Sequence, residues 1–161
     1  FADGDGSARV LFVGAAPGAN EDEQGIPFVG RAGSLLTDII EKGMGLPRKQ
    51  VMITNVLKCR PPENRDPSPA EKHICTSWLE RQVQLSGARV VIPLGNHAAG
   101  QLLQQPGALL GQLRGQAHER DGHQVIPTFD PGDLLRSPDM KKECWKDIQR
   151  AMTELGLKPP A

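Results

Sequence analysis

The sequence has no apolar run close to the roughly 20 residues that a membrane-spanning helix needs, so it predicts a protein without a membrane span. It has no excess charge, because 19 Lys and Arg balance 19 Asp and Glu. A nucleic-acid partner would therefore be held by a local cluster of Lys and Arg, since the total charge neither demands nor excludes one. Three cysteines do not suit a disulfide framework, and no secretory signal opens the chain. We therefore expect a cytoplasmic protein with no membrane partner.

The length of 161 residues is that of one domain with one core. Apolar residues make up 38% of the chain and charged residues 24%, which is typical of globular proteins. The first residue is Phe1 and not Met, so we expect the natural protein to extend further upstream. We interpret residues 1–161 as a single domain that lacks a natural N-terminal segment.

Apolar, beta-branched runs alternate along the chain with helical patterns, and each run ends at Gly or Pro. The expected strands are 9–14, 50–56, 88–95 and 124–129. The expected helices are 33–43, 69–86, 96–105 and 138–155, and Ser68, Pro69 and Glu71 mark the start of the second. Because the strands are apolar almost throughout, we expect them to be buried on both faces. The pattern predicts an α/β fold, a three-layer α/β/α sandwich around a four-stranded parallel sheet.

Three unusual loops follow the first, second and fourth of these strands, at 14–33, 55–65 and 130–136. Since the carboxyl ends of parallel strands meet at one edge of a sheet, we expect the loops to converge there and to form the functional site.

The turn after the first strand, GAAPG, has neither the GxGxxG spacing nor the Lys and Ser or Thr of a P-loop, so a phosphate cradle is weakly supported. Gly14, Pro17 and Gly18 could simply make a tight turn between strand and helix. A tight turn does not account for Phe28, an aromatic residue in a loop of Gly, Pro and acids. A flat ligand would give this ring a surface on which to stack.

The cysteines leave two interpretations open. Cys59 lies in a Pro-rich loop and Cys75, beyond an intervening fifteen residues, lies on an expected helix. Two such cysteines are more often small buried residues than ligands. As ligands, two thiolates could not complete the four-sulfur set of a cubane cluster or a structural zinc. The four histidines lie at no spacing that indicates a metal site.

The segment TFDPGDLLR also has two interpretations. Leu134 and Leu135, followed by Arg136, could form an apolar wedge beside a phosphate contact, as in proteins that push a base out of the duplex. On spacing alone, a helix-capping turn whose leucines pack back into the core is equally favoured.

The motifs together resemble, in order and spacing, those of the iron-sulfur, family-four uracil-DNA glycosylases. The resemblance extends from about Val10 to Ile148. The matching segments are GAAPGANEDEQGIPFVGRAGSLL, VMITNVLKCRPPENRDPSPAEKHICTSWLERQ, VVIPLGNHAA, LRGQ and PTFDPGDLLR.

The resemblance implies a pocket for a uracil flipped out of DNA. Phe28 would stack on the pyrimidine, and main-chain groups near Ala16 and Gly18 would meet its edge. Asn55 matches the residue that reads the amide face of uracil. Its carboxamide can accept from N3 and donate to O4, whereas cytosine presents the opposite pattern.

The resemblance also implies a cofactor and a DNA contact. Cys59 and Cys75 correspond to two ligands of a [4Fe-4S] cluster, and the other two are expected in a CxxC upstream of Phe1. Cys144 matches no ligand. The segment Leu134, Leu135 and Arg136 resembles the one that fills the vacated base stack and holds the strand.

The sequence departs from the family at two positions in the expected pocket. Ala15 stands where the family usually has an acid, although a related family with an apolar residue there is active. Asp130 stands where the family has a His that donates to uracil O2. A buried Asp130 could stay protonated and donate as the His does. His123 cannot replace it, because about six extended residues at ~3.3 Å each separate the two.

These residues predict a base-excision repair glycosylase that acts on DNA containing uracil or another deaminated base and uses Asn55 and Asp130 in catalysis. We expect it to be a monomer. One alternative is a catalytically weak homologue that binds DNA or a modified base. A small-molecule nucleotide binder on a related sheet rests on fold analogy alone.

Overall fold

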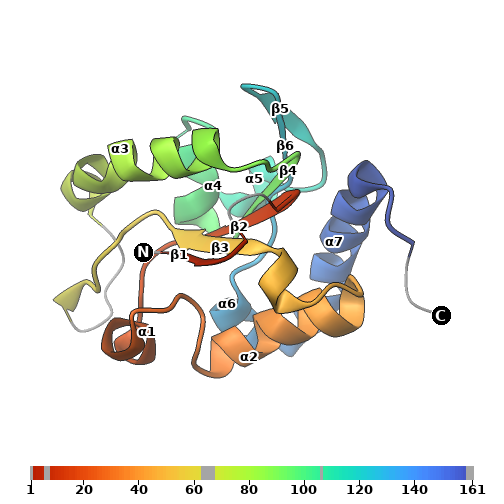
Figure 1. Ribbon diagram of the computed structural model, residues 1–161, viewed down its shortest axis with the longest axis horizontal. Coiled ribbons are helices and arrows are strands. Elements are labelled where there is room, and N and C mark those ends of the chain that lie inside the picture. The colour runs from red at the N-terminus through yellow and green to blue at the C-terminus, as the bar shows by residue number, and fades with distance from the viewer. Residues whose placement is uncertain (1, 6–7, 63–67, 106, 159–161) are drawn as a thin grey trace.

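The computed structural model describes residues 2–5, 8–62, 68–105 and 107–158. A central sheet has helices on both of its faces (Figure 1). In the described residues the strand order is β1-β3-β2-β4-β6-β5. The strands are β1 (Ala2–Gly4), β2 (Val10–Gly14), β3 (Met52–Asn55), β4 (Val90–Pro93), β5 (His118–Arg120) and β6 (His123–Val125).

The four expected strands are β2, β3, β4 and β6, and they form the parallel centre of the sheet. The sheet has six strands rather than four, because β1 and β5 pair antiparallel with the outer parallel strands. Each of these edge strands has three residues and no apolar run, so no periodic pattern marks them in the sequence. The last parallel strand is shorter than expected, and a single bridge between Leu94 and Thr128 continues its contact with β4.

The four expected helices are all present. The first is α2 (Arg31–Asp38), which continues as the π-helical turn η1 (Ile39–Gly43). The others are α3 (Pro69–Leu85), α4 (Asn96–Leu102) and α7 (Lys141–Leu155), the last preceded by the 3-10 turn η4 (Pro138–Met140). Shorter helical segments are α1 (Ala19–Gln24), η2 (Arg48–Gln50), α5 (Leu110–Leu113) and α6 (Pro131–Arg136).

The start of α3 has the capping arrangement that its sequence predicts. The Glu71 main-chain N–H donates to Ser68 Oγ at 3.2 Å, and the Ser68 N–H donates to Glu71 Oε1 at 2.9 Å. This capping box satisfies two N–H groups that a helix otherwise leaves without a partner.

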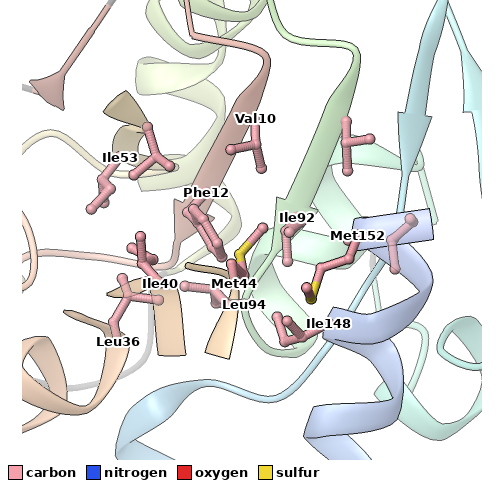
Figure 2. Packing of buried hydrophobic residues seen from close by; sticks show 14 of the residues in the cluster. Val10, Phe12, Leu36, Ile40, Met44, Ile53, Ile92, Leu94, Ile148 and Met152 are labelled. Carbon is pink, nitrogen blue, oxygen red and sulfur yellow. The ribbon is translucent and has the colours of Figure 1, made fainter. Parts of the chain in front are cut away.

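The core lies in two clusters, one on each face of the sheet. Successive residues of β2 point to opposite faces, so Phe12 packs towards α2 and α7 whereas Leu11 packs towards α3 and α4. Figure 2 shows the first cluster, in which Phe12 and Ile92 from the sheet contact side chains of α2 and α7. Burial on both faces confirms the three-layer α/β/α architecture and explains the continuous apolar strands.

Across the parts of the chain that the structure describes, no helix is both long and apolar enough to span a bilayer.

Candidate active site

The carboxyl edge of the sheet brings the loops after β2, β3 and β6 together. Gly14, the last residue of β2, lies directly beside Asn55, the last residue of β3. On the other side of β2, Gly95 follows β4 and donates its N–H to Thr128 O at 2.9 Å. A Cβ at Gly95 would lie 3.3 Å from Asp130 Cβ, so Asp130 also borders this edge.

Phe28 and Asn55 converge over Gly14. A Cβ added at Gly14 would lie 2.4 Å from Asn55 Oδ1 and 2.5 Å from Phe28 Cζ. Both distances are far shorter than a carbon contact allows, so only glycine fits beneath these two side chains. Two residues that are 27 positions apart in the sequence therefore meet at one point above the sheet.

Asn55 carries an unusual polar atom. Its side chain is buried, and Oδ1 has no hydrogen-bond partner among the described residues. A buried acceptor without a partner costs about 1–3 kcal/mol, so such an atom requires an explanation. An N–H of a bound ligand that reaches Oδ1 would satisfy it.

The main chain of Asn55 is fixed by Lys58. The ammonium donates to Asn55 O at 2.6 Å and to Thr54 Oγ1 at 2.9 Å, and it also donates to Gln82 Oε1 on α3. Burial lowers the pKa of Lys58 to about 8, and the charge interaction with the Cys75 sulfur opposes this shift. The network connects β3 to α3 directly below the candidate site.

The loop that carries Phe28 is closed by the carboxylate of Glu21. Oε1 accepts from the Gly18 N–H at 3.0 Å, and Oε2 accepts from the Val29 and Gly30 N–H groups, both at 3.0 Å. The Gly18 N–H, one of the main-chain groups expected to meet the ligand, is therefore engaged within the loop itself. Ala15 and Ala16 lie between Gly14 and this clamp, and Ala15 O accepts from Leu57 N at 2.9 Å.

Asp130 caps the amino end of α6. Its Oδ1 accepts from the Gly132 N–H at 2.8 Å. Burial raises the pKa of this carboxyl, and the hydrogen bond from Gly132 opposes the rise. The charges of Asp133 and Arg136 act in smaller, opposite directions. Since Oδ1 is an acceptor, a proton on this group belongs on Oδ2.

The segment before Asp130 is held by a buried ion pair. Arg114 Nε donates to Asp147 Oδ2 at 3.0 Å, and Thr128 Oγ1 donates to the same oxygen at 2.8 Å. The guanidinium carbon of Arg114 also lies 4.9 Å from the centre of the Phe129 ring. Arg114, in the LRGQ motif, thus fixes the two residues that precede Asp130.

Of the three residues expected to contact DNA, one lies in the core and two lie at the surface. Leu134 is 1% exposed and packs in the first core cluster, so the expectation that it reaches DNA disagrees with the structure. Leu135 is 37% exposed, and Arg136 is exposed and pairs with Asp133. Neighbouring residues of a helix point in different directions, so α6 buries one leucine and exposes the other.

The two expected cluster ligands are both free thiols. Cys59 is exposed in the loop after β3, and Cys75 is partly exposed on α3, whereas Cys144 is buried. Within the described residues no group of three or more His, Cys, Asp or Glu side chains could hold a metal ion. Cys59 and Cys75 therefore supply two of the four thiolates that a [4Fe-4S] cluster requires.

Sequence reasoning missed three residues that organise the site. Glu21 could have been found from the G-x-x-E spacing at Gly18, which is typical of a capped helix start. Arg48 and Lys58 have no local signal for the contacts that join separate segments, because Phe28 lies 20 residues from Arg48 and Gln82 lies 24 residues from Lys58.

A cavity of about 450 Å³ lies elsewhere, between α3, α4 and the β5–β6 hairpin. It is lined by Leu79, Val83, Gln101 and Arg120, among others, and does not include the residues around Gly14.

Known proteins match the chain along nearly its whole length. A family model described as the uracil DNA glycosylase superfamily matches residues 1–149. A type-4 uracil-DNA glycosylase of Sulfurisphaera tokodaii is 38% identical over 159 residues, which cover 94% of this chain and 72% of the relative. The type-4 uracil-DNA glycosylase of Thermotoga maritima is 39% identical, with 92% of this chain and 79% of the relative covered. A type-5 uracil-DNA glycosylase of Pyrobaculum aerophilum is 31% identical, with 81% and 64% covered. The chain belongs to the uracil-DNA glycosylase superfamily.

Proposed function

We propose that this protein is a DNA-repair glycosylase that binds a uracil extruded from DNA and hydrolyses the bond between the base and its deoxyribose. The observation that carries the proposal is the convergence of the Phe28 ring and the unpartnered Asn55 Oδ1 over Gly14. The superfamily membership of the chain supports it.

Asn55 selects the base. Its Oδ1 accepts from uracil N3–H and its amide nitrogen donates to O4, while Phe28 stacks on the ring. Cytosine presents an acceptor at N3 and a donor at C4, so it would leave both Asn55 groups without partners and is rejected. Ala15 and Ala16 follow Gly14 in the same turn and would border the bound base.

Asp130 acts on the departing uracil. As the glycosidic bond breaks, the base gains negative charge and the sugar becomes an oxocarbenium-like cation that water captures. An ionised carboxylate ~4 Å from the anion would cost on the order of 4 kcal/mol at an effective dielectric of ~20, or about a thousandfold in rate. A protonated Asp130, favoured by its burial, instead donates from Oδ2 to uracil O2.

The order of strands gives this pair of residues a suitable separation. Asn55 ends β3 and Asp130 follows β6, and these strands are three strand spacings of ~4.8 Å apart, or ~14 Å. A pyrimidine fits between two short polar side chains that approach from these two positions, with O4 towards Asn55 and O2 towards Asp130.

Cys59 and Cys75 would hold two positions of a [4Fe-4S] cluster. Such a cluster, when bound, links the loop after β3 to α3 through iron–sulfur bonds. Both segments already meet through Lys58 and Gln82, so the chain itself keeps Asn55 aligned with α3. Leu135 and Arg136 are the exposed residues of the TFDPGDLLR segment and would contact the DNA strand. We place the protein in the cytoplasm, acting as a monomer on DNA.

A second function, DNA or base binding with slow or absent excision, is favoured by one observation. Asp130 and Ala15 replace the two polar residues that the family usually has in this pocket.

An oligonucleotide that contains one deoxyuridine distinguishes the two functions. After incubation and treatment with alkali, strand scission by the parent protein and its loss in Asn55→Ala support the glycosylase. Scission only by Asp130→His would assign the binding function to this chain, with Asp130 as the disabling residue. No scission by either protein, together with tight binding of the oligonucleotide, would also contradict excision.

A further inference from the structure

We propose that Arg48 is a positioning residue that holds Phe28 in the orientation needed to stack on the extruded base. This inference rests on the proposed function, because it assigns a role to Arg48 through the ring that is expected to contact uracil.

Arg48 binds two consecutive carbonyl groups of the Phe28 loop. Its Nη1 donates to Phe28 O at 2.8 Å and its Nη2 donates to Pro27 O at 2.6 Å. The guanidinium is itself anchored, since Nη1 donates to Thr37 Oγ1 on α2 at 2.8 Å and Nε pairs with Asp3 on β1 at 3.3 Å. The Arg48 side chain is 18% exposed, so these contacts are largely shielded from water.

Phe28 needs this support because of its backbone. Its φ is +55°, a left-handed conformation that a bulky residue adopts only where its surroundings hold it. A Cβ at Gly33 would lie 2.0 Å from Phe28 O, so α2 packs directly against the same carbonyl group. Arg48 and Gly33 together therefore fix the carbonyl of Phe28, and with it the direction of the ring.

The two sides of the loop are held by opposite charges. Arg48 binds the carbonyl groups of residues 27 and 28, whereas Glu21 accepts from the N–H groups of residues 29 and 30. The peptide groups around Phe28 thus lie between a cation and an anion. The guanidinium donates from three separate nitrogens in a rigid fork, whereas a lysine ammonium donates from one atom on a flexible stem. Lysine would therefore reproduce only part of this set of contacts.

The expected consequence of losing Arg48 is weaker binding of the base. Stacking forms as the base enters the site and persists during the reaction, so its loss changes KM more than kcat. For Arg48→Met we expect KM to rise about tenfold with kcat within about threefold, and for Arg48→Lys a smaller rise. Thr37→Val, which removes one anchor of the guanidinium, should shift KM in the same direction.

A double-mutant cycle with Phe28→Ala tests whether Arg48 acts through the ring. The measurements are KM and kcat on a deoxyuridine oligonucleotide, and the Kd for the same oligonucleotide with 2′-fluoro-deoxyuridine, in which the glycosidic bond is stabilised. Arg48→Met should raise KM and Kd in the parent and have no further effect in Phe28→Ala. Arg9→Met is the control, because Arg9 also joins distant segments, by donating to Leu155 O at 2.9 Å, yet lies outside the site.

An equal effect of Arg48→Met in both backgrounds would overturn the inference, as would a loss that Arg9→Met reproduces. If Arg48→Met does not fold, the cycle with Arg48→Lys gives the same decision. A parent protein that binds the uncleavable oligonucleotide but excises no uracil would contradict the proposed function, and the Kd cycle alone would then decide the role of Arg48.

Discussion

Gly14→Ala places one methyl group at the point where Phe28 and Asn55 converge. The added carbon would lie 2.4 Å from Asn55 Oδ1 and 2.5 and 2.6 Å from Phe28 Cζ and Cε2. The backbone of Gly14 is an ordinary strand conformation, so the substitution strains the side chains and not the main chain. Both groups must move by the order of an ångström. Since misplacement on that scale costs about a hundredfold in rate, we expect kcat/KM to fall about a hundredfold, or ~2.7 kcal/mol.

Single-turnover excision of uracil from a single-stranded oligonucleotide measures this loss directly. Gly111→Ala is the matched control, because a Cβ at Gly111 in α5 meets no atom within 4 Å and should leave excision unchanged. Overpacking predicts a loss of stability of about 1–3 kcal/mol for Gly14→Ala, which urea unfolding checks. If the variant excises uracil within threefold of the parent, Phe28 and Asn55 do not grip the base at this point.

Two further predictions concern Asp130 and the residues that support it. The raised pKa of Asp130 means that the folded protein keeps this proton at pH values where the unfolded chain has lost it, so stability falls as pH rises through that window. The rate of excision should fall over the same rise in pH. Asp130→Asn keeps an N–H donor that does not titrate, so its excision rate should not depend on pH in this window. A variant with the same rate–pH profile as the parent would contradict the role of the carboxyl. Asp147→Asn removes the 1%-exposed charge that faces Arg114, so urea unfolding should show a loss of about 3 kcal/mol. Glu143→Gln removes a 38%-exposed carboxylate that pairs with the same guanidinium at 3.6 Å, and it should cost much less stability because water screens this pair. A loss under about 1 kcal/mol for Asp147→Asn would contradict this account.

The sequence was most informative about the parallel sheet and its carboxyl edge. Continuous apolar runs identified β2, β3, β4 and β6, because strands buried on both faces have few polar residues. The positions of Asn55 and Phe28 followed from the same pattern, since Asn55 ends one parallel strand and Phe28 lies in the loop after another. The short edge strands β1 and β5 were not predicted, because three mostly polar residues have no periodicity.

Contacts between distant residues could not be predicted from local patterns. Arg48 binds a carbonyl 20 residues earlier in the chain, and Lys58 binds a glutamine 24 residues later. Leu134 illustrates a different limit, because the side chains of two adjacent leucines point about 100° apart on a helix, and the sequence does not show which of them faces the core. Only the packing of α6 decides that Leu134 is buried.

The most direct test is a crystal structure of the protein bound to an oligonucleotide with 2′-fluoro-deoxyuridine. We expect uracil N3 within about 3 Å of Asn55 Oδ1, with the Phe28 ring stacked on the pyrimidine. A base bound away from Gly14, with Oδ1 still lacking a partner, would contradict the assignment of this site.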